Sequence, residues 1–323
     1  MKKIGVFTSG GDAPGMNACI RAIVRTAVYH GIEVYGIRRG YNGMIKGEIS
    51  KLESYSVSNI IQKGGTILRS ARSKDFMTKE GRKTAYEQLQ KLGIEGLVAI
   101  GGDGTFTGAN IFFEEYGLPT IGAPGTIDND LYGTDYTIGY DTAVNTALDA
   151  IDKIRDTADS HDRVFFIEVM GRDSGYIAIP CAIGGGAEIV MIPETDTSID
   201  YVVDTLRTGW SRSKTSFIVI VAEGDAEGSA TDVASKVQEA LPHMDARVTI
   251  LGHVQRGGSP TAADRMLASQ LGIACVEGLI SGRQNEMAGI IDGKLTYTPF
   301  IDTITKDKPI NPEFINMVNI LSV

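Results

Sequence analysis

The sequence predicts an α/β fold built from two doubly wound, Rossmann-like lobes, with mostly parallel sheets and an active site in the cleft between the lobes. The chain repeats one pattern, an apolar strand followed by a glycine-rich turn and a helical segment, which is typical of parallel sheets covered by helices. Its 323 residues exceed what one hydrophobic core usually organises, so two lobes are expected. Polar clusters follow the predicted strands, where open α/β sheets bind their ligands.

Alternating strands and helices can be placed in order along the chain. A strand at residues 4–8 leads through a glycine-rich turn into a helix at residues 16–29, and a second strand spans residues 33–37. Short apolar runs predict further strands, several of which are expected to be buried on both faces. These strands span residues 97–100, 120–123, 164–169, 189–192, 216–222 and 247–251. Residues 142–157 are strongly helical, and Asp292-Gly293 between two apolar runs predicts a small hairpin at residues 289–297.

The composition is that of an ordinary soluble globular protein, with 42% hydrophobic and 22% charged residues. The net charge of −9 argues against nucleic acid as the main partner, although a few local arginines could still bind a phosphorylated ligand. Cys19, Cys181 and Cys275 lie far apart and include no CxxC pair, which favours reduced thiols and a cytoplasmic location. No stretch reaches the length of a membrane span, and the first apolar run is too short for a signal peptide.

Two segments carry the strongest chemical signal, and each directly follows a predicted strand. The first is GGDGT at residues 101–105, whose glycines leave room for a nucleotide phosphate tail against the backbone. Asp103 would then supply a carboxylate oxygen to Mg²⁺. The alternative is that Asp103 only caps the helix that follows. The flanking glycines exceed what a cap requires, so we favour the phosphate-binding interpretation.

The second segment is PGTIDND at residues 124–130. Thr126, Asp128 and Asp130 alternate, so an extended loop would present all three side chains on one side. One carboxylate could orient a hydroxyl group and accept its proton late in the reaction, while the other supports the metal or the substrate. An acidic surface turn would not explain a Pro-Gly entry and two acids directly after an apolar strand. Together, the two segments predict phosphoryl transfer to a hydroxyl group.

Other polar residues also follow predicted strands. The glycines at residues 10–11 free backbone amides at a helix N-terminus, either for a phosphate or only for a tight turn. The chain has neither the GxxxxGK[ST] nor the GxGxxG pattern, so it is neither a Walker A protein nor an ordinary dinucleotide binder. Later strands are followed by cations and a carboxylate that suit a sugar phosphate. These residues are Arg172, Glu223, His253 and Arg256.

Five motifs give the chain a resemblance to a known family. Besides GGDGT and PGTIDND, they are TSGGDAPGMN at residues 8–17, VMGR at residues 169–172 and GHVQRGGSP at residues 252–260. With these motifs, the chain resembles the bacterial ATP-dependent 6-phosphofructokinases over essentially its whole length. GGDGT alone also occurs in NAD kinases and lipid kinases, whereas PGTIDND together with MGR and GHxQRGG is highly specific.

The resemblance implies transfer of the γ-phosphoryl group of MgATP to the 1-hydroxyl of fructose 6-phosphate, which yields fructose 1,6-bisphosphate and ADP in the committed step of glycolysis. It implies Mg²⁺ as the metal and a cytoplasmic homotetramer whose active site is completed by a neighbouring subunit, with no nucleic acid or membrane partner. A larger, ATP-binding lobe would comprise residues 1–139 and about 257–305. A smaller lobe, which binds fructose 6-phosphate, would comprise residues 140–256 and about 306–323.

The resemblance also assigns site residues, position by position. Asp128 is implied as the catalytic base, Asp103 as the magnesium ligand and Arg72 as the cation between the two phosphates, while Thr126 and Arg172 complete the catalytic set. The implied ATP-binding positions are Gly11, Tyr41, Arg72, Ser73, Gly102, Asp103, Gly104, Thr105 and Gly108. The implied sugar-phosphate positions are Thr126, Asp128, Asp130, Met170, Gly171, Arg172, Glu223, His253 and Arg256, together with Arg163 and Arg247 donated by a neighbouring subunit.

An effector site is implied as well, and in this family it binds ADP or GDP as activator and phosphoenolpyruvate as inhibitor. Its positions are Arg21, Arg25, Ser54, Ser58, Asn59, Arg155, Gly186, Glu188, Arg212 and Lys214. Arg21 and Arg25 lie one helical turn apart, and without the resemblance a solvated basic face would explain them. Ser54 stands where well-studied members carry arginine, and Thr215-Ser216 replace a basic stretch. We therefore expect this site to bind anions less tightly.

Two glycines indicate the phosphoryl donor. In similar pyrophosphate-dependent enzymes, the position of Gly104 tends to carry Asp and that of Gly125 tends to carry Lys. An acid at position 104 would repel the α-phosphate region of ATP, and a lysine at position 125 suits pyrophosphate, so we expect ATP. Met77 departs from the family, because it replaces an arginine near the ATP site.

Three other interpretations remain as alternatives. The first is the pyrophosphate-dependent phosphotransferase. The second is an inactive sugar-phosphate or nucleotide sensor on the same scaffold, although Asp103, Asp128 and Arg172 are all intact. The third is a Rossmann oxidoreductase, which would need the dinucleotide fingerprint and a ribose-binding acid that this chain lacks.

Overall fold

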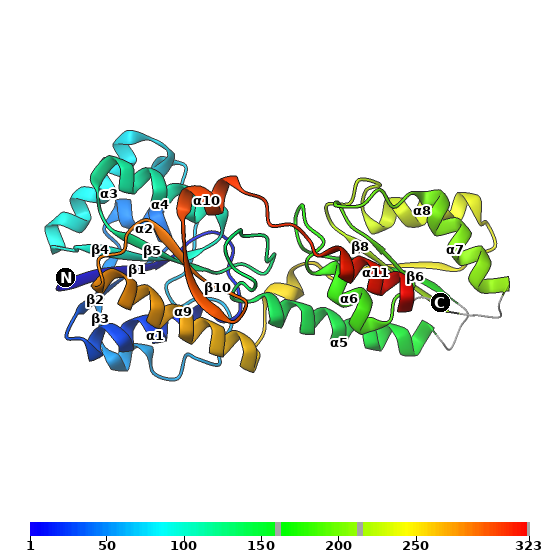
Figure 1. The fold of residues 1–323 in the computed structure, drawn as a ribbon, viewed down its shortest axis with the longest axis horizontal. Coiled ribbons are helices and arrows are strands. Elements are labelled where there is room, and N and C mark those ends of the chain that lie inside the picture. Colours follow the sequence, from blue (N-terminus) through cyan, green and yellow to red (C-terminus); the bar gives the residue numbers. More distant parts are fainter. Residues whose placement is uncertain (159–162, 212–215, 322–323) are drawn as a thin grey trace. The chain divides into compact units, whose positions relative to one another are not determined.

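The computed structural model describes residues 1–158, 163–211 and 216–321, and its contacts divide the chain into two compact units. Unit 1 consists of Met1–Ile127, Leu131–Thr142 and Arg256–Lys308. Unit 2 consists of Asp128–Asp130, Ala143–Gln255 and Pro309–Val323. Each unit contains one sheet covered by helices, which confirms the predicted α/β class (Figure 1). The boundaries differ from the expected lobes by a few residues, most notably because residues 128–130 belong to unit 2 and Arg256 belongs to unit 1.

Unit 1 is built around a seven-stranded sheet with the strand order β11-β10-β5-β4-β1-β2-β3. Its strands are β1 (Lys3–Thr8), β2 (Glu33–Ile37), β3 (Ile49–Leu52), β4 (Gly96–Gly101), β5 (Thr120–Pro124), β10 (Glu286–Ile291) and β11 (Lys294–Pro299). The five central strands are parallel, and β3 and β11 pair antiparallel at the edges. The predicted hairpin is β10–β11, and its turn residues Asp292 and Gly293 both have positive φ, at 51° and 73°. The sequence did not predict β3, because Ser50 and Lys51 interrupt its apolar ends.

Helices cover both faces of the unit 1 sheet. They are α1 (Met16–Tyr29), α2 (Gly40–Lys46), α3 (Lys79–Leu92), α4 (Asp103–Tyr116), α9 (Ala262–Ile280) and α10 (Phe300–Thr305), with the 3-10 turns η1 (Ser54–Val57) and η2 (Asp75–Met77). α1 and α9 pack against each other on one face, and α2, α3, α4 and α10 lie on the other (Figure 1). Local chemistry sets the helix ends. For example, α3 begins where Thr78 accepts a hydrogen bond from the amide of Gly81, and it ends at the left-handed Gly93.

One core of unit 1 lies between its sheet and α2, α3 and α4. Phe7 of β1 and Leu97 of β4 pack there against aromatic side chains of the helices. The rings of Tyr41 and Phe76 stack with their centroids 3.9 Å apart, and Phe112 lies against Phe76. Burial of each such ring stabilises the fold by about 1.5–3 kcal/mol. β4 is buried along its whole length, which explains its continuous apolar sequence.

Unit 2 contains a four-stranded parallel sheet with the strand order β7-β8-β6-β9. Its strands are β6 (Val164–Val169), β7 (Ile189–Met191), β8 (Phe217–Ala222) and β9 (Ala246–Ile250). Its helices are α5 (Tyr140–Ala158), α6 (Ala178–Gly185), α7 (Ile199–Ser211), α8 (Ala230–Ala240) and α11 (Pro312–Leu321), and the 3-10 turn η3 (Gly252–Arg256) follows β9. The first three residues of α5 and the last residue of η3 belong to unit 1.

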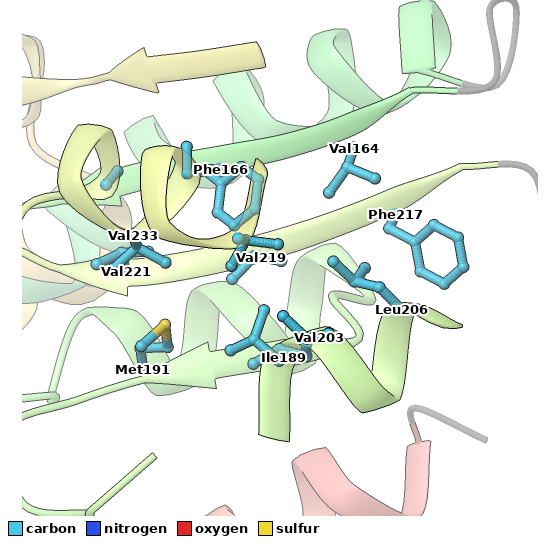
Figure 2. Close-up of a cluster of buried hydrophobic side chains, with 14 of the residues drawn as sticks. Val164, Phe166, Ile189, Met191, Val203, Leu206, Phe217, Val219, Val221 and Val233 are labelled. Carbon is cyan, nitrogen blue, oxygen red and sulfur yellow. The ribbon is translucent and has the colours of Figure 1, made fainter. Parts of the chain in front are cut away.

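One core of unit 2 lies between its sheet and the helices α7 and α8. Figure 2 shows Val219 and Val221 of β8 on this side, together with Leu206 of α7 and Val233 of α8. Alternate residues of β8 face this core because successive side chains of a strand point to opposite faces. The residues between them are buried as well, since α6 packs against the other face of the sheet.

The structure confirms most of the predicted elements. Each predicted strand is present within about one residue of its expected ends, and the two predicted helices are α1 and α5. Cys19, Cys181 and Cys275 are unpaired and buried. In the part of the chain that the structure describes, no helix is both long and apolar enough to cross a lipid bilayer.

Candidate active site

The first candidate region lies where the winding of the unit 1 sheet reverses. From β1 the chain continues to its neighbour β2 on one side, whereas β4 and β5 lie on the other side. Open α/β sheets bind ligands at the carboxyl ends of the strands at such a point. The amide of Ser9 donates to the carbonyl oxygen of Ile100 over 3.0 Å, which ties the end of β1 to the end of β4. The glycines at residues 10–11 and 101–102 therefore lie close together there.

Helix α4 begins within the GGDGT segment. Gly102 is its N-cap residue and Asp103 is its first residue, and no side chain makes a capping hydrogen bond. Asp103 is therefore not the N-cap residue of α4, and its expected role as a magnesium ligand stays a prediction. Asp103 is exposed in the first turn. The amides at this N-terminus and the positive end of the helix dipole attract phosphate groups.

Thr105 presents an unsatisfied hydroxyl in the same segment. Its side chain is 2% exposed, yet its Oγ1 makes no hydrogen bond within the described part of the chain. Such buried groups are rare and indicate a ligand or an ordered water. The backbone oxygen of Thr105 accepts a hydrogen bond from Tyr41 Oη over 2.6 Å, and burial raises the pKa of Tyr41. Tyr41 thus supports the loop from the core, and its expected contact with ATP stays a prediction.

The two glycines that bear on the phosphoryl donor differ in their surroundings. A β-carbon at Gly104 would meet no protein atom within 4 Å, so packing does not require glycine there. A β-carbon at Gly125 would lie 3.0 Å from Ile100 and 3.1 Å from Met16. Core packing alone therefore favours glycine at position 125. The expected preference for ATP over pyrophosphate therefore depends on Gly104.

The PGTIDND segment stands beside GGDGT, as predicted. β5 is the parallel neighbour of β4, and the amide of Gly125 donates to the carbonyl oxygen of Gly101 over 2.9 Å. Two further hydrogen bonds, of 2.8 and 2.7 Å, run from residues 137–138 to the carbonyl oxygens of Pro124 and Thr126. These contacts fix the backbone that leads to Asp128.

Asp264 anchors this arrangement, although no pattern in the sequence predicted its role. Its side chain is 1% exposed and accepts hydrogen bonds from the amide of Gly139 over 2.7 Å and from the amide and the hydroxyl of Thr142. Burial raises the pKa of Asp264, and these hydrogen bonds oppose that effect. In the sequence, the spacing of Thr261 and Asp264 suggests only the cap of α9, and Thr261 does cap it. The carboxylate of Asp264 instead holds the start of α5, beside residues 137–138.

Residues 128–130 continue the segment within unit 2. Asp128 is 3% exposed, and its carbonyl oxygen accepts a hydrogen bond from Ser174 Oγ over 3.4 Å. Asn129 has a left-handed backbone, with φ 54°, so the loop is not extended there and the expected alternation of side chains fails between Asp128 and Asp130. Burial raises the pKa of Tyr176 to about 12, and the charges of Glu194 and Asp130 add to the effect.

In unit 2, the central strand β6 ends in the turn at residues 170–172. Gly171 and Arg172 have positive φ, at 147° and 54°. Glu223, which follows the neighbouring strand β8, accepts hydrogen bonds at Oε1 from the amides of Gly171 and Arg172 over 3.3 and 2.7 Å. A β-carbon at Gly224 would lie 2.2 Å from the carbonyl oxygen of Arg172, so glycine is required for this approach. Glu223 therefore holds the turn, in addition to its expected role with sugar hydroxyls.

The turn η3 follows β9 on the other side of β6. His253 is exposed there, and Gln255 is completely buried. Gln255 Oε1 accepts a hydrogen bond from the amide of Met170 over 2.9 Å, whereas its Nε2 makes none to any residue that the structure describes. No local pattern predicts a role for Gln255, because its partner lies 85 residues away.

The two arginines expected to serve a neighbouring subunit share one carboxylate. Asp245 lies 2.8 Å from Arg163 Nε through one oxygen and 3.0 Å from Arg247 Nη2 through the other. Both arginines remain partly exposed. No pattern in the sequence predicted the role of Asp245, and the expected role of the two arginines stays a prediction.

The remaining expected cations lie in unit 1. Arg256 Nη1 donates to the carbonyl oxygen of Asp12 over 3.5 Å, and its guanidinium lies against Gly11. Arg256 thus contacts the glycine loop after β1, and its expected role with the sugar phosphate stays a prediction. Arg72 is exposed in the loop before η2, and the neighbouring Ser73 Oγ accepts a hydrogen bond from the amide of Phe76.

The expected effector residues form one group in each unit. Arg21, Arg25, Ser54, Ser58 and Asn59 belong to unit 1, where η1 packs against α1, while Arg155, Gly186 and Glu188 belong to unit 2. Arg21 and Arg25 make no ion pair with the described residues. Arg155 has a structural role as well, because it donates to the carbonyl oxygens of Gly185 and Gly186 at the end of α6. Arg212, Lys214 and Thr215 lie outside the described residues.

Comparison with known proteins identifies close relatives. The family model described as phosphofructokinase matches residues 3–279. An ATP-dependent 6-phosphofructokinase from Cytophaga hutchinsonii is 66% identical over 322 residues, which cover 100% of this chain and 98% of the relative. The ATP-dependent 6-phosphofructokinase 1 of Thermus thermophilus is 57% identical over 323 residues, which cover 100% of both chains.

Solved structures agree with this similarity. Phosphofructokinase from Pichia pastoris in the T-state is 35% identical and superposes with a TM-score of 0.89, covering 94% of this chain and 35% of the yeast chain. A pyrophosphate-dependent phosphofructokinase from Marinobacter aquaeolei is 24% identical, with a TM-score of 0.82, and covers 97% of this chain and 86% of that chain. At 24% identity, the similarity to the Marinobacter aquaeolei protein shows a shared fold and nothing more.

Proposed function

The chain belongs to the phosphofructokinase family, and we propose that it transfers the γ-phosphoryl group of ATP to the 1-hydroxyl of fructose 6-phosphate. The products are fructose 1,6-bisphosphate and ADP, and the reaction is the committed step of glycolysis in the cytoplasm. Relatives with 66% and 57% identity carry the name ATP-dependent 6-phosphofructokinase, which supports both the donor and the acceptor.

One observation carries the proposal, namely the position of GGDGT and PGTIDND at the ends of the neighbouring strands β4 and β5. The first segment offers the N-terminal amides of α4 and the unsatisfied hydroxyl of Thr105 to a polyphosphate. The second segment leads directly to the buried carboxylate of Asp128. Phosphoryl transfer depends mainly on positioning and on stabilisation of charge, and these are the functions that the two segments supply.

In the proposed reaction, Asp128 orients the 1-hydroxyl and accepts its proton as the new O–P bond forms. The amides at the start of α4 and the guanidinium of Arg72 stabilise the negative charge on the transferring group and on the departing ADP. Arg172 and its neighbours in the turn at residues 170–172 hold the sugar phosphate, and Thr126 helps to orient the acceptor beside Asp128. Each of these residues acts by binding or orienting, except Asp128, which also moves a proton.

Asp103 is the residue that would hold Mg²⁺. Within the described ranges, no group of three or more His, Cys, Asp or Glu side chains could hold a metal ion. A single exposed carboxylate beside a phosphate-binding helix N-terminus nevertheless fits Mg²⁺, because this ion usually takes one or two protein carboxylates and completes its shell with phosphates and water. When bound, Mg²⁺ would neutralise charge on the polyphosphate.

The proposal is tested by measuring ADP formation with MgATP and fructose 6-phosphate. We expect Asp128→Asn to lower kcat by about a hundredfold or more, because it removes the proton acceptor. Asp302→Asn is the matched control, since Asp302 lies on α10 in an exposed ion pair with Lys306 and should leave turnover unchanged. Turnover of Asp128→Asn within tenfold of wild type would remove Asp128 as the base. Absence of sugar-dependent ADP formation in the wild type would refute the reaction itself.

Pyrophosphate is the second candidate donor, and Gly104 argues against it. The open space at this glycine leaves room for a bulky nucleotide, whereas an aspartate would place negative charge there. We therefore expect the wild-type protein to use ATP and to show no turnover with pyrophosphate in a coupled assay. A higher kcat/KM with pyrophosphate than with ATP would reverse this assignment.

We also propose a homotetramer in which Arg163 and Arg247 complete the site of a neighbouring subunit. The support is their shared placement at Asp245, where both guanidinium groups remain partly exposed. The test mixes Asp128→Asn with Arg247→Ala, each inactive by itself, after joint dissociation and reassociation. Hybrid tetramers should regain turnover, because some sites then combine an intact Asp128 with an intact Arg247. A tetramer that exchanges subunits but regains no activity would contradict the shared site.

Regulation by ADP or GDP and by phosphoenolpyruvate belongs to the same proposal. Arg21 and Arg25 on α1 are the supporting observation, since they carry positive charge without ion pairs to the described residues. We expect ADP to lower, and phosphoenolpyruvate to raise, the half-saturating concentration of fructose 6-phosphate. Arg25→Ala should weaken both effects without changing kcat. If neither compound moves the half-saturation point of the wild type, this part of the proposal fails.

A further inference from the structure

The turn at residues 170–172 has a backbone conformation that its own sequence does not favour. Gly171 has φ 147°, which suits glycine, but Arg172 has φ 54° in the left-handed region. Residues with a β-carbon avoid this region unless surrounding contacts hold them there. Something outside the turn must therefore fix its conformation.

Side-chain oxygens from two other elements satisfy three successive amides of the turn. Gln255 Oε1, from η3, accepts a hydrogen bond from the amide of Met170 over 2.9 Å. Glu223 Oε1, after β8, accepts hydrogen bonds from the amides of Gly171 and Arg172 over 3.3 and 2.7 Å. The turn thus receives its hydrogen bonds from the ends of both strands that flank β6. These two residues orient all three amides.

The burial of Gln255 shows which of its atoms matters. The side chain is completely buried, and its Nε2 makes no hydrogen bond to the described residues. An unsatisfied buried amide group destabilises a protein, so an apolar side chain of the same size would be preferred if only packing mattered. A glutamate would also satisfy Met170, but it would bring a second carboxylate into the surroundings of Glu223. Glutamine supplies the acceptor without that charge.

We infer that Gln255 is a positioning residue, whose buried amide oxygen sets the turn at residues 170–172 for sugar-phosphate binding. The inference rests on the proposed function, because Met170, Gly171 and Arg172 are expected sugar-phosphate contacts. Gln255 has no exposed surface with which to touch a ligand, so it acts through the amide of Met170. Its substitution should therefore change the affinity for the sugar phosphate more than the rate of the chemical step.

The kinetic test uses two variants and a control. Gln255→Met keeps the size of the side chain and removes the acceptor, and we expect it to raise the KM for fructose 6-phosphate about tenfold while kcat changes less than threefold. Gln255→Glu keeps an acceptor oxygen in either protonation state, so its KM should rise much less. Val237→Ala, in the core of unit 2, controls for a general loss of stability and should leave KM unchanged. An unchanged KM in folded Gln255→Met, or equal increases in both variants, would overturn the inference.

Hydrogen exchange in the absence of substrate supplies a second readout that does not depend on activity. The amide of Met170 should exchange at least about tenfold faster in Gln255→Met than in the wild type, because its acceptor is lost. The amide of Ile167, inside β6, should keep its protection. Unchanged exchange at Met170 would refute the positioning role even if the protein had a different substrate. Wild-type protein without phosphofructokinase activity would refute the proposed function, while faster exchange at Met170 would still establish the role of Gln255 in the turn.

Discussion

Replacing Asp264 by alanine should destabilise unit 1 and also lower its activity. The carboxylate is 1% exposed and accepts hydrogen bonds from two backbone amides, those of Gly139 and Thr142, over 2.7 and 2.8 Å. Alanine leaves both amides without an acceptor in a buried place. The activity should fall because the segment that Asp264 holds also donates hydrogen bonds to Pro124 and Thr126.

The magnitude can be estimated from these contacts. Each buried amide that loses its acceptor costs about 1–3 kcal/mol. The hydroxyl of Thr142 adds little, because it also accepts a hydrogen bond from the amide of Thr261 and can rotate. Burial of the charged carboxylate opposes its stabilising effect, as the raised pKa of Asp264 shows, and its removal relieves that cost. We therefore expect a net loss of about 3 kcal/mol in the free energy of unfolding.

Urea unfolding followed by circular dichroism measures this loss, and hydrogen exchange at Gly139 and Thr142 locates it. Trp210, the single tryptophan, lies in α7 and reports on unit 2 separately through its fluorescence. The matched control is Asp232→Ala, because Asp232 also binds the start of a helix through the amide and the hydroxyl of Ser229. The carboxylate of Asp232 is exposed, so in the variant water can accept the hydrogen bonds that it accepts in the wild type. The loss in the free energy of unfolding should therefore be much smaller than for Asp264→Ala.

Comparing Asp264→Ala with Asp232→Ala shows whether burial or the number of hydrogen bonds determines the loss in the free energy of unfolding. Equal losses in Asp264→Ala and Asp232→Ala would refute the reasoning, because the two carboxylates make similar numbers of contacts. Full activity of folded Asp264→Ala would separately disprove the link between Asp264 and the PGTIDND segment.

Three further substitutions test the charges and the open space of the structure. Gly104→Asp should not destabilise the fold, because a β-carbon there meets no atom within 4 Å, but it should raise the KM for ATP about tenfold or more. An unchanged KM in initial-rate assays would contradict the preference for ATP that is drawn from Gly104. Glu115 binds Arg82 through both of its carboxylate oxygens, each at 2.7 Å, and this pairing lowers the pKa of Glu115 below its ordinary value of 4.5. The ion pair therefore stabilises the fold above pH 4.5, and this stabilisation is lost as the pH falls through the lowered pKa. Wild type and Glu115→Gln should therefore differ by about 1–2 kcal/mol at pH 7 and converge in acid, and urea unfolding at several pH values would detect a difference that failed to shrink. Burial raises the pKa of Tyr176 to about 12 from its ordinary value of 10, so its contribution to stability is present below pH 10 and is lost between pH 10 and 12. Tyr176→Phe also loses the hydrogen bond to Pro309, and its free energy of unfolding should depend less on pH in that range.

The sequence by itself determined the class of fold and the chemistry of its strand ends. Short apolar runs between glycine-rich turns define the strands, because only buried strands tolerate such continuous apolar sequence. An alternation of strands and helices then forces a parallel sheet, and parallel neighbours end on the same edge. For this reason, the adjacency of GGDGT and PGTIDND could be predicted before any coordinates. Edge strand β3 could not, because half of its residues face solvent and carry no pattern.

Only the tertiary structure decided which side chain orients which backbone group. Gln255, Asp264 and Asp245 each bind a group that lies 82 to 125 residues away in the sequence, and no local pattern predicts those contacts. The sequence also presented Gly104 and Gly125 as equivalent, whereas packing favours glycine only at position 125. Residue types and spacing fix which chemistry is possible at a strand end. A hydrogen bond between distant residues depends on how the strands are ordered in the sheet, and that order emerges only when the whole core is assembled.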